Sequence, residues 1–140
     1  MKILAPVDGS EASLKAIKCA CKMLASTAEL SITLISVHDD VALKHARTIV
    51  GSKAIEEYLR QLANEDIAKA KALLEQEGIR HEVVIRTGHV SQEIVDLADQ
   101  GGFELIVMGN KGRSALHDLL IGSVAQRVLS LAKTPVLLVK

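Results

Sequence analysis

Aromatic residues are almost missing from this chain of 140 residues. Apart from histidine, its aromatic side chains are Tyr58 and Phe103 alone, and it has no tryptophan. A core must therefore be aliphatic, and the chain offers few rings on which nucleic-acid bases could stack. Charge is balanced, with 17 Lys and Arg against 17 Asp and Glu, so no excess positive charge would attract a phosphate backbone. Both features argue against a DNA- or RNA-binding protein.

Long hydrophobic runs are missing as well. Apolar residues make up 49% of the chain and its mean hydropathy is +0.25, which is too apolar for a disordered chain. No apolar stretch approaches the ~20 residues that a membrane helix needs, and the apolar run near Met1 is too short for a signal peptide. We therefore expect a cytoplasmic protein without membrane association, forming a single domain over residues 1–140.

Neither the cysteines nor the histidines have the spacing of a metal or redox site. Cys19 and Cys21 lack the C-x-x-C pattern, so we interpret them as small core or surface residues that stay reduced in the cytoplasm. His38 and His117 each precede aspartates, but without a fixed ligand spacing. We expect no dedicated metal site and no catalytic residue among them.

Short apolar runs alternate with longer segments of helical periodicity. We predict strands at 3–7, 30–37, 81–86, 105–108 and 136–139. Apolar residues at three-and-four spacing predict helices between these strands, the longest from about 52 to 77. The segment 38–51 is polar and mixed, and we interpret it as a loop. Strands that alternate with helices predict an α/β fold with a mostly parallel sheet.

Two loops follow predicted strands at the place where an open α/β sheet binds ligands. Ligands bind such sheets beyond the carboxyl ends of the strands, where the strand order reverses. The first strand is followed by Asp8-Gly9-Ser10, and the fourth by a glycine-bearing segment from Gly109 to Gly122. These two loops are therefore the candidate binding site.

The segment after the fourth strand has the features of a phosphate site. Gly109 and Gly112 lack a Cβ, so their backbone N–H groups can approach a ligand closely. Gly122-Ser123 opens the last helix, whose first turn presents unpaired N–H groups and a positive dipole end, and Lys111 adds positive charge. On spacing alone, these glycines could equally form only turns and a helix start. The chain also lacks the P-loop and the usual dinucleotide-binding motif.

The spacing of these residues is more specific than their individual properties. Gly109, Gly112, Gly122 and Ser123 follow the pattern G-x2-G-x9-G-[ST]. This pattern, the opening segment 3–10 and the closing segment 134–140 together resemble the universal stress protein family. The resemblance spans the chain and is weakest from 40 to 77. It implies a three-layer, adenine nucleotide α-hydrolase-like fold, with an open parallel five-stranded sheet in the order 3-2-1-4-5 and helices on both faces.

The resemblance also implies a ligand, because the complete glycine pattern is typical of the members that bind ATP. Ten positions match the nucleotide-binding residues of the family: Pro6, Val7, Asp8, Val37, Met108, Gly109, Gly112, Gly122, Ser123 and Val124. The first six would surround adenine and ribose, and the last four would form the phosphate cradle. A Mg or Mn ion would be held through the phosphates, with few protein ligands. Glu104 stands where the family often has Asp.

The function implied is an ATP-binding module that senses or signals nucleotide state to an unidentified protein partner in a stress response. A response-regulator receiver is excluded, because Arg86-Thr87-Gly88 follows the third strand where a phospho-accepting Asp would stand. A slow ATP hydrolase or an autophosphorylating protein remains the alternative. Asp8 is the one carboxylate expected near the nucleotide, and no clear general base is present, so we expect weak turnover at most.

The last strand predicts a homodimer. In the implied order, residues 136–139 lie at the edge of the sheet, are wholly aliphatic and end at Lys140. An edge of this kind offers unpaired backbone groups to another strand, and pairing with a second copy across a two-fold axis would satisfy both edges. The alternative is that the segment following the second strand covers this edge.

Overall fold

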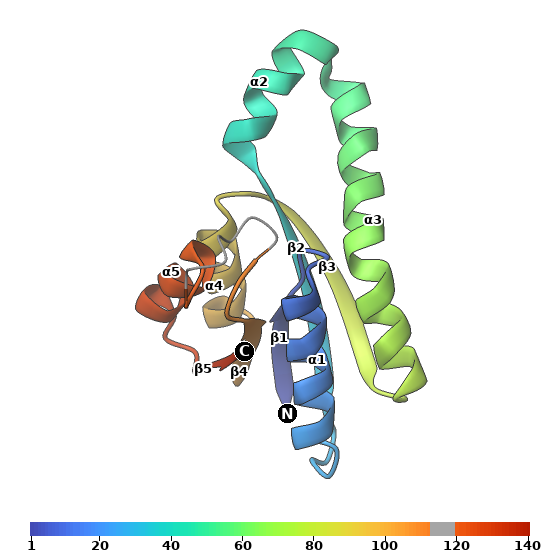
Figure 1. Ribbon diagram of the computed structural model, residues 1–140, viewed down its shortest axis with the longest axis vertical. Coiled ribbons are helices and arrows are strands. Elements are labelled where there is room, and N and C mark those ends of the chain that lie inside the picture. Colours follow the sequence, from blue (N-terminus) through green and yellow to red (C-terminus); the bar gives the residue numbers. More distant parts are fainter. Residues whose placement is uncertain (113–119) are drawn as a thin grey trace.

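The computed structural model describes the whole chain except residues 113–119 and the side chains of Asp40 and Ala42. Five parallel strands form one sheet in the order β3-β2-β1-β4-β5, which confirms the predicted order (Figure 1). The strands are β1 (Lys2–Pro6), β2 (Ser31–Asp39), β3 (Arg80–Gly88), β4 (Leu105–Gly109) and β5 (Val136–Val139). Neighbours β1 and β4 mark the reversal of strand order.

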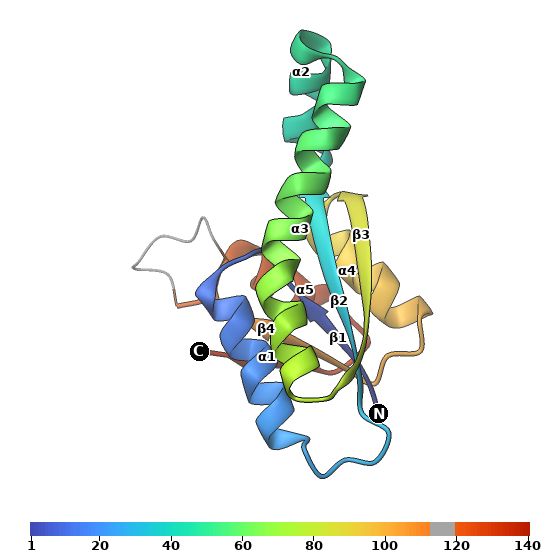
Figure 2. The same ribbon diagram turned by 90° about the vertical axis from the view of Figure 1, so that its right-hand side faces the viewer.

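Helices cover both faces of this sheet, which confirms the three-layer architecture (Figure 2). They are α1 (Glu11–Met23), α2 (Asp40–Val50), α3 (Ser52–Gln76), α4 (Val90–Gln100) and α5 (Ser123–Leu131). One face packs against α1 and α3, and the other against α4 and α5. Among the described residues, no helix combines the length and the apolar character needed to cross a membrane.

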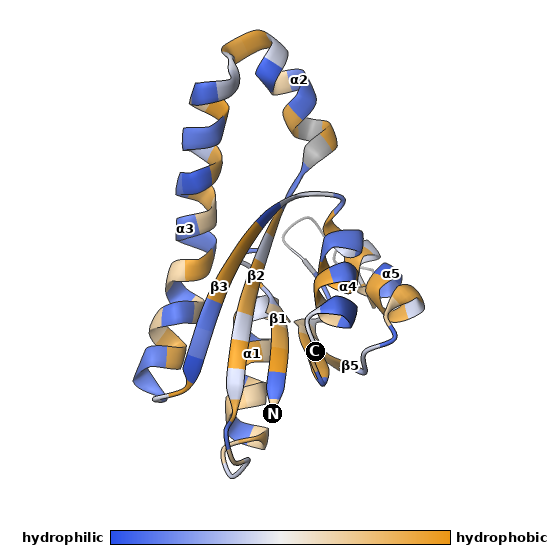
Figure 3. Cartoon of the chain, turned by 180° about the vertical axis from the view of Figure 1, so that it is seen from behind, coloured by the Kyte–Doolittle hydropathy of each residue, from blue (hydrophilic) through white to orange (hydrophobic). Residues whose placement is uncertain are grey.

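Two aliphatic clusters fill the space between the sheet and its helices. Ile3 and Leu4 are adjacent and both fully buried, because successive side chains of a strand point to opposite faces. Ile3 packs with Ile17 of α1 and Leu74 of α3, whereas Leu4 packs with Ile94 of α4. A central strand covered on both sides therefore needs an unbroken apolar run, and Figure 3 shows hydrophobic residues concentrated on the central strands.

The segment between β2 and α3 corrects one prediction. Residues 38–51 are not a loop, because α2 occupies most of them. The Asp39 side chain caps this helix by accepting a hydrogen bond from the Val41 amide at 2.8 Å. Leu43 of α2 and Ile55 of α3 are buried. Leu43, Ala46 and Val50 recur at helical spacing, so the sequence carried a signal for this helix that the interpretation as a loop overlooked.

The two helices form a hairpin that extends beyond the sheet (Figures 1 and 2). Gly51 joins them with a φ of 90°, a conformation that residues with a side chain rarely adopt. The hairpin contacts β3, which lies at the opposite edge of the sheet from β5. The alternative to the homodimer, in which this segment covers the β5 edge, is therefore wrong.

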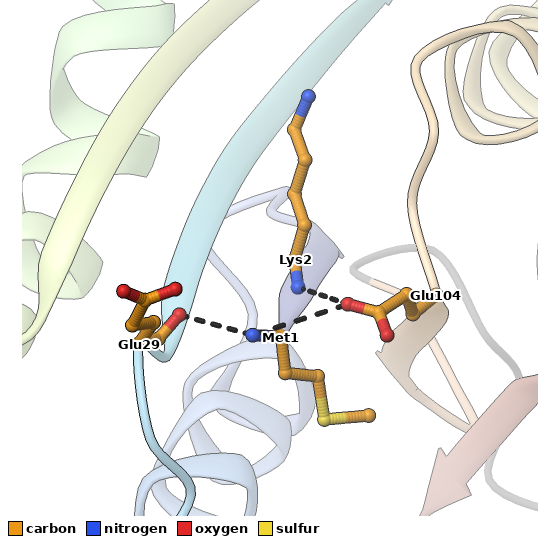
Figure 4. Close-up of polar contacts among 4 residues, drawn as sticks. All are labelled: Met1, Lys2, Glu29 and Glu104. Atoms are coloured by element: carbon orange, nitrogen blue, oxygen red, sulfur yellow. Dashed lines mark hydrogen bonds and ion pairs between the residues drawn. The ribbon is translucent and has the colours of Figure 1, made fainter.

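The start of β1 is tied to the residue that precedes β4 (Figure 4). The Met1 ammonium donates to the Glu29 carbonyl at 3.0 Å and lies 3.9 Å from the Glu104 carboxylate. The same Glu104 oxygen accepts a hydrogen bond from the Lys2 amide at 2.8 Å. Glu104 thus holds the amino ends of β1 and β4 together. These ends are opposite the carboxyl ends of the strands, where the candidate site lies.

Candidate functional site

A cavity of about 250 Å³ opens at the carboxyl ends of β1 and β4. This is the point where the strand order reverses, as the rule for open α/β sheets predicts. All ten residues selected from the sequence line it: Pro6, Val7, Asp8, Val37, Met108, Gly109, Gly112, Gly122, Ser123 and Val124. Lys111 lines it as well. Segments from four parts of the chain therefore meet at one place.

Five further lining residues were missed by the sequence analysis: Ser13, Ile35, Val90, Ile94 and Ala125. Val90 and Ile94 lie one turn apart at the start of α4, so they share one face of that helix. Ile94 and Ile35 are also nearly fully buried. An i, i+4 apolar pair directly after a strand was an available signal, but only the tertiary packing places it here. The result is an aliphatic wall along one side of the cavity.

The amino-terminal end of α5 also lines the cavity. Its N-cap is Gly122, and within the described part of the chain no side chain caps this helix. The first backbone N–H groups of a helix have no intrahelical partner, and the helix dipole adds partial positive charge there. Ser123, Val124 and Ala125 supply these groups and all line the cavity. This end of the cavity suits an anion.

The glycines of the site have packing roles that the sequence analysis did not foresee. A Cβ on Gly109 would lie 2.8 Å from the carbonyl carbon of Ala12, so this glycine lets α1 pack closely on β4. A Cβ on Gly112 would lie 2.9 Å from Oδ2 of Asp8. The other carboxylate oxygen of Asp8 accepts a hydrogen bond from the Ser10 amide at 3.0 Å. Gly112 therefore makes room for the Asp8 carboxylate.

Gly122 uses both of its backbone polar groups within the protein. Its N–H already donates to the Asn110 carbonyl at 2.7 Å, so the cradle predicted from the resemblance would begin with the amides of the next residues. The carbonyl of Gly122 accepts the first intrahelical bond, from Gln126 at 3.0 Å. Gly122 thus directs the chain into α5.

Comparison with known proteins identifies the family. Residues 1–140 match the model of the universal stress protein family. The chain belongs to this family. It is 34% identical to Universal stress protein MJ0531 of Methanocaldococcus jannaschii over 139 residues, which cover 99% of this chain and 81% of that protein.

Solved structures of universal stress proteins share the fold. The structure of MJ0577, a universal stress protein of Methanocaldococcus jannaschii, matches with a TM-score of 0.87 at 30% identity, over 99% of this chain and 94% of that one. A universal stress protein in complex with cAMP matches with a TM-score of 0.62 at 27% identity, over 100% and 97% of the two chains.

Cys19, Cys21 and His38 of this universal stress protein do not line the cavity. Within the described residues, no group of three His, Cys, Asp or Glu side chains is placed to hold a metal ion. The cysteines are free, and burial raises the pKa of the Cys21 thiol. His38 lies at the end of β2, where burial lowers its pKa against the opposing effect of Asp66. His117 lies outside the described residues.

Proposed function

We propose that this universal stress protein binds ATP in the cavity between β1 and β4. The observation that carries the proposal is the uncapped start of α5, which faces a cavity lined by all ten residues implied by the family's nucleotide motif. Its volume of about 250 Å³ lies below the ~300–1,000 Å³ of typical ligand pockets. The base and ribose would fill the enclosed part of the cavity. The phosphates would extend toward Gly112 and the start of α5.

The adenine would be held without ring stacking. The wall beside β2 and α4 is aliphatic, built from Ile35, Val37, Val90 and Ile94. Apolar contacts would bind the faces of the base, and the backbone of Val37 would meet its polar edge. The cAMP complex of a related universal stress protein supports an adenine nucleotide as the class of ligand.

The phosphates would lie at the start of α5. Lys111, Ser123, Val124 and Ala125 line the cavity, and their backbone amides, the Ser123 hydroxyl and the Lys111 ammonium would contact the phosphates. Backbone amides at a helix start bind phosphate well because the dipole favours negative charge there. A Mg or Mn ion would be held mainly by the phosphates, since such ions keep several waters and need few protein ligands.

The proposed role of ATP binding is to sense or signal nucleotide state in a stress response, in the cytoplasm and through a protein partner.

Among the described residues lining the cavity, Asp8 is the only carboxylate. It accepts a hydrogen bond from the Ser10 amide and faces Gly112, so it is held in place by the protein. We infer that any hydrolysis is far slower than the ~10 per second of a median enzyme.

The protein is further proposed to form a homodimer through β5. This strand is an edge of the sheet, and its four aliphatic residues are only half-buried. Antiparallel pairing with the β5 of a second copy would satisfy the unpaired backbone groups of both edges. Leu137→Pro removes a donor from the middle of this strand, so sedimentation should show a dimer for the parent and mostly monomer for the variant. A monomeric parent at tens of micromolar would exclude the dimer.

Mass spectrometry tests the ligand directly. The protein is purified without added nucleotide, denatured, and the released small molecules are identified. We expect ATP, with Mg or Mn increasing the amount retained. Release of no nucleotide, together with no heat on calorimetric titration with ATP, would overturn the proposed function.

A further inference from the structure

Two side-chain amides hold the segment that leads into α5. The Asn110 side chain donates through Nδ2 to the Leu120 carbonyl at 2.9 Å. The Gln126 side chain donates through Nε2 to the carbonyl of the next residue, Ile121, at 3.1 Å. The amide of Gly122 donates to the Asn110 backbone carbonyl at 2.7 Å. Three consecutive residues are thus fixed by hydrogen bonds from outside the segment.

These contacts join the sheet to the helix. The Asn110 amide, directly after β4, donates to the carbonyl of Val139 in β5 at 2.9 Å. Gln126 belongs to the first turns of α5, and its own amide donates to the Gly122 carbonyl. Asn110 therefore holds the residues that precede α5 close to the end of β4.

The hydrogen bonds also decide which polar groups are available to a ligand. The carbonyl oxygens of Leu120 and Ile121 accept hydrogen bonds from the Asn110 and Gln126 side chains. The N–H of Gly122 already donates to the Asn110 backbone carbonyl. Ser123, Val124 and Ala125 line the cavity, whereas Asn110 and Gln126 do not. A site whose donors are held in place before binding loses less entropy when the ligand arrives.

We propose that Asn110 and Gln126 form an amide clamp, a pair of positioning residues that orders the phosphate end of the cavity without contacting the ligand. Asn110 stands at an open position of the pattern G-x2-G-x9-G-[ST] and Gln126 lies beyond its end, so the pattern itself specifies neither residue. The proposal rests on the proposed binding of ATP. It acts on the phosphates through the segment 120–122 and leaves the aliphatic wall around the base unchanged.

The test compares the affinities of ATP and adenosine by titration calorimetry. Asn110→Ala removes one hydrogen bond from the clamp, and Asn110→Leu removes the same donor while keeping a side chain that branches at Cγ. A typical hydrogen bond contributes ~0.5–1.5 kcal/mol, so ATP binding should weaken by about two- to tenfold in each variant. Gln126→Ala should weaken it by a similar or smaller factor, and the double variant more than either. Adenosine affinity should stay within about twofold of the parent throughout.

Asn64→Ala is the matched control, because it removes an exposed side-chain amide from α3, away from the cavity. It should bind both ligands as the parent does. Circular dichroism establishes that each variant is folded, and if Asn110→Ala unfolds, Asn110→Leu and Gln126→Ala decide. Unchanged ATP affinity in the double variant would overturn the clamp, as would an equal loss for ATP and adenosine.

Amide hydrogen exchange without ligand separates failure of the clamp from failure of the proposed function. Exchange at Gly122 should be slow in the parent and faster in Asn110→Ala, because loss of the side-chain bond loosens the segment that carries this amide. A parent that binds neither ATP nor adenosine would overturn the proposed function and the ligand role of the clamp together, whatever the exchange shows. A parent that binds ATP, with exchange at Gly122 unaffected by the substitution, would overturn the clamp alone.

Discussion

The helices α1 and α5 both begin at the carboxyl end of the strands, but their first turns are capped differently. At α1, the Ser10 hydroxyl accepts a hydrogen bond from the Ser13 amide at 3.2 Å, and Ser13 returns one to the Ser10 carbonyl at 2.8 Å. At α5, the capping position is Gly122, and within the described residues no side chain caps the helix. One helix start therefore has an amide bonded to a capping side chain, and the other has no such cap within the described residues.

This difference separates a structural helix start from a binding one. A Ser, Thr, Asp or Asn at the N-cap stabilises a helix by ~0.5–2 kcal/mol relative to alanine. Glycine at the cap of α5 supplies no oxygen to compete with a phosphate. Both glycine and serine are ordinary capping residues, so the type of residue alone does not distinguish the roles. What distinguishes them is that the Ser10 hydroxyl accepts the Ser13 amide at the start of α1, whereas no described side chain accepts an amide at the start of α5.

The largest effect is expected from Gly112→Val, which disturbs both helix starts. The new side chain would meet Oδ2 of Asp8 and displace a carboxylate whose other oxygen holds the Ser10 amide. It would also stand where the phosphates are proposed to lie. Each charge-assisted hydrogen bond lost costs ~1.5–3 kcal/mol, so ATP affinity should fall by about tenfold or more. Calorimetric titration of the folded variant measures this, and an unchanged affinity would exclude a phosphate site beside this glycine.

Gly122→Asp should turn the binding start into a structural one. The φ of Gly122 is −71°, which any residue can adopt, and a Cβ there would approach its neighbours no closer than 3.4 Å. The carboxylate would cap α5 and repel phosphate, so ATP affinity should fall by about three- to tenfold. The free energy of unfolding should rise by a few tenths of a kcal/mol. Urea denaturation and calorimetry measure the two quantities, and a variant that binds ATP as the parent does would show that the uncapped start is not needed.

Ser10→Ala is the reciprocal change and should have the smallest effect on binding. It removes the cap of α1, so the free energy of unfolding should fall by about 1 kcal/mol. ATP affinity should change by less than about twofold, because Ser10 does not line the cavity. A loss of ATP affinity larger than the one caused by Gly122→Asp would reverse the assignment of the two helix starts.

Much of this architecture could be predicted from local features of the sequence. Buried strands are recognisable as unbroken aliphatic runs, such as the one from Ile3 to Val7, and the alternation of strands and helices indicates a parallel sheet. The strand order came with the family resemblance, as did the ten cavity residues. Their glycine spacing is local, because Gly109 and Gly122 bound a single loop.

The rest depends on contacts between distant segments. The helix α2 is an exception, because Leu43, Ala46 and Val50 recur at helical spacing and the interpretation as a loop overlooked this local signal. Val90 and Ile94 could be assigned to a helix, but only the packing of α4 beside β2 brings them to the cavity. The bond between the Asn110 side chain and the Leu120 carbonyl spans ten residues, and no spacing rule predicts it.

The central claim is that ATP binds at the open start of α5 and not at the capped start of α1. The most direct measurement follows backbone amide resonances by NMR during a titration with ATP, and repeats it with adenosine. ATP should shift the amides of Ser123, Val124 and Ala125 strongly and that of Ser13 weakly, and adenosine should leave the three α5 amides nearly unshifted. Shifts that are equal for the two ligands at α5, or larger at Ser13 than at Ser123, would contradict the account.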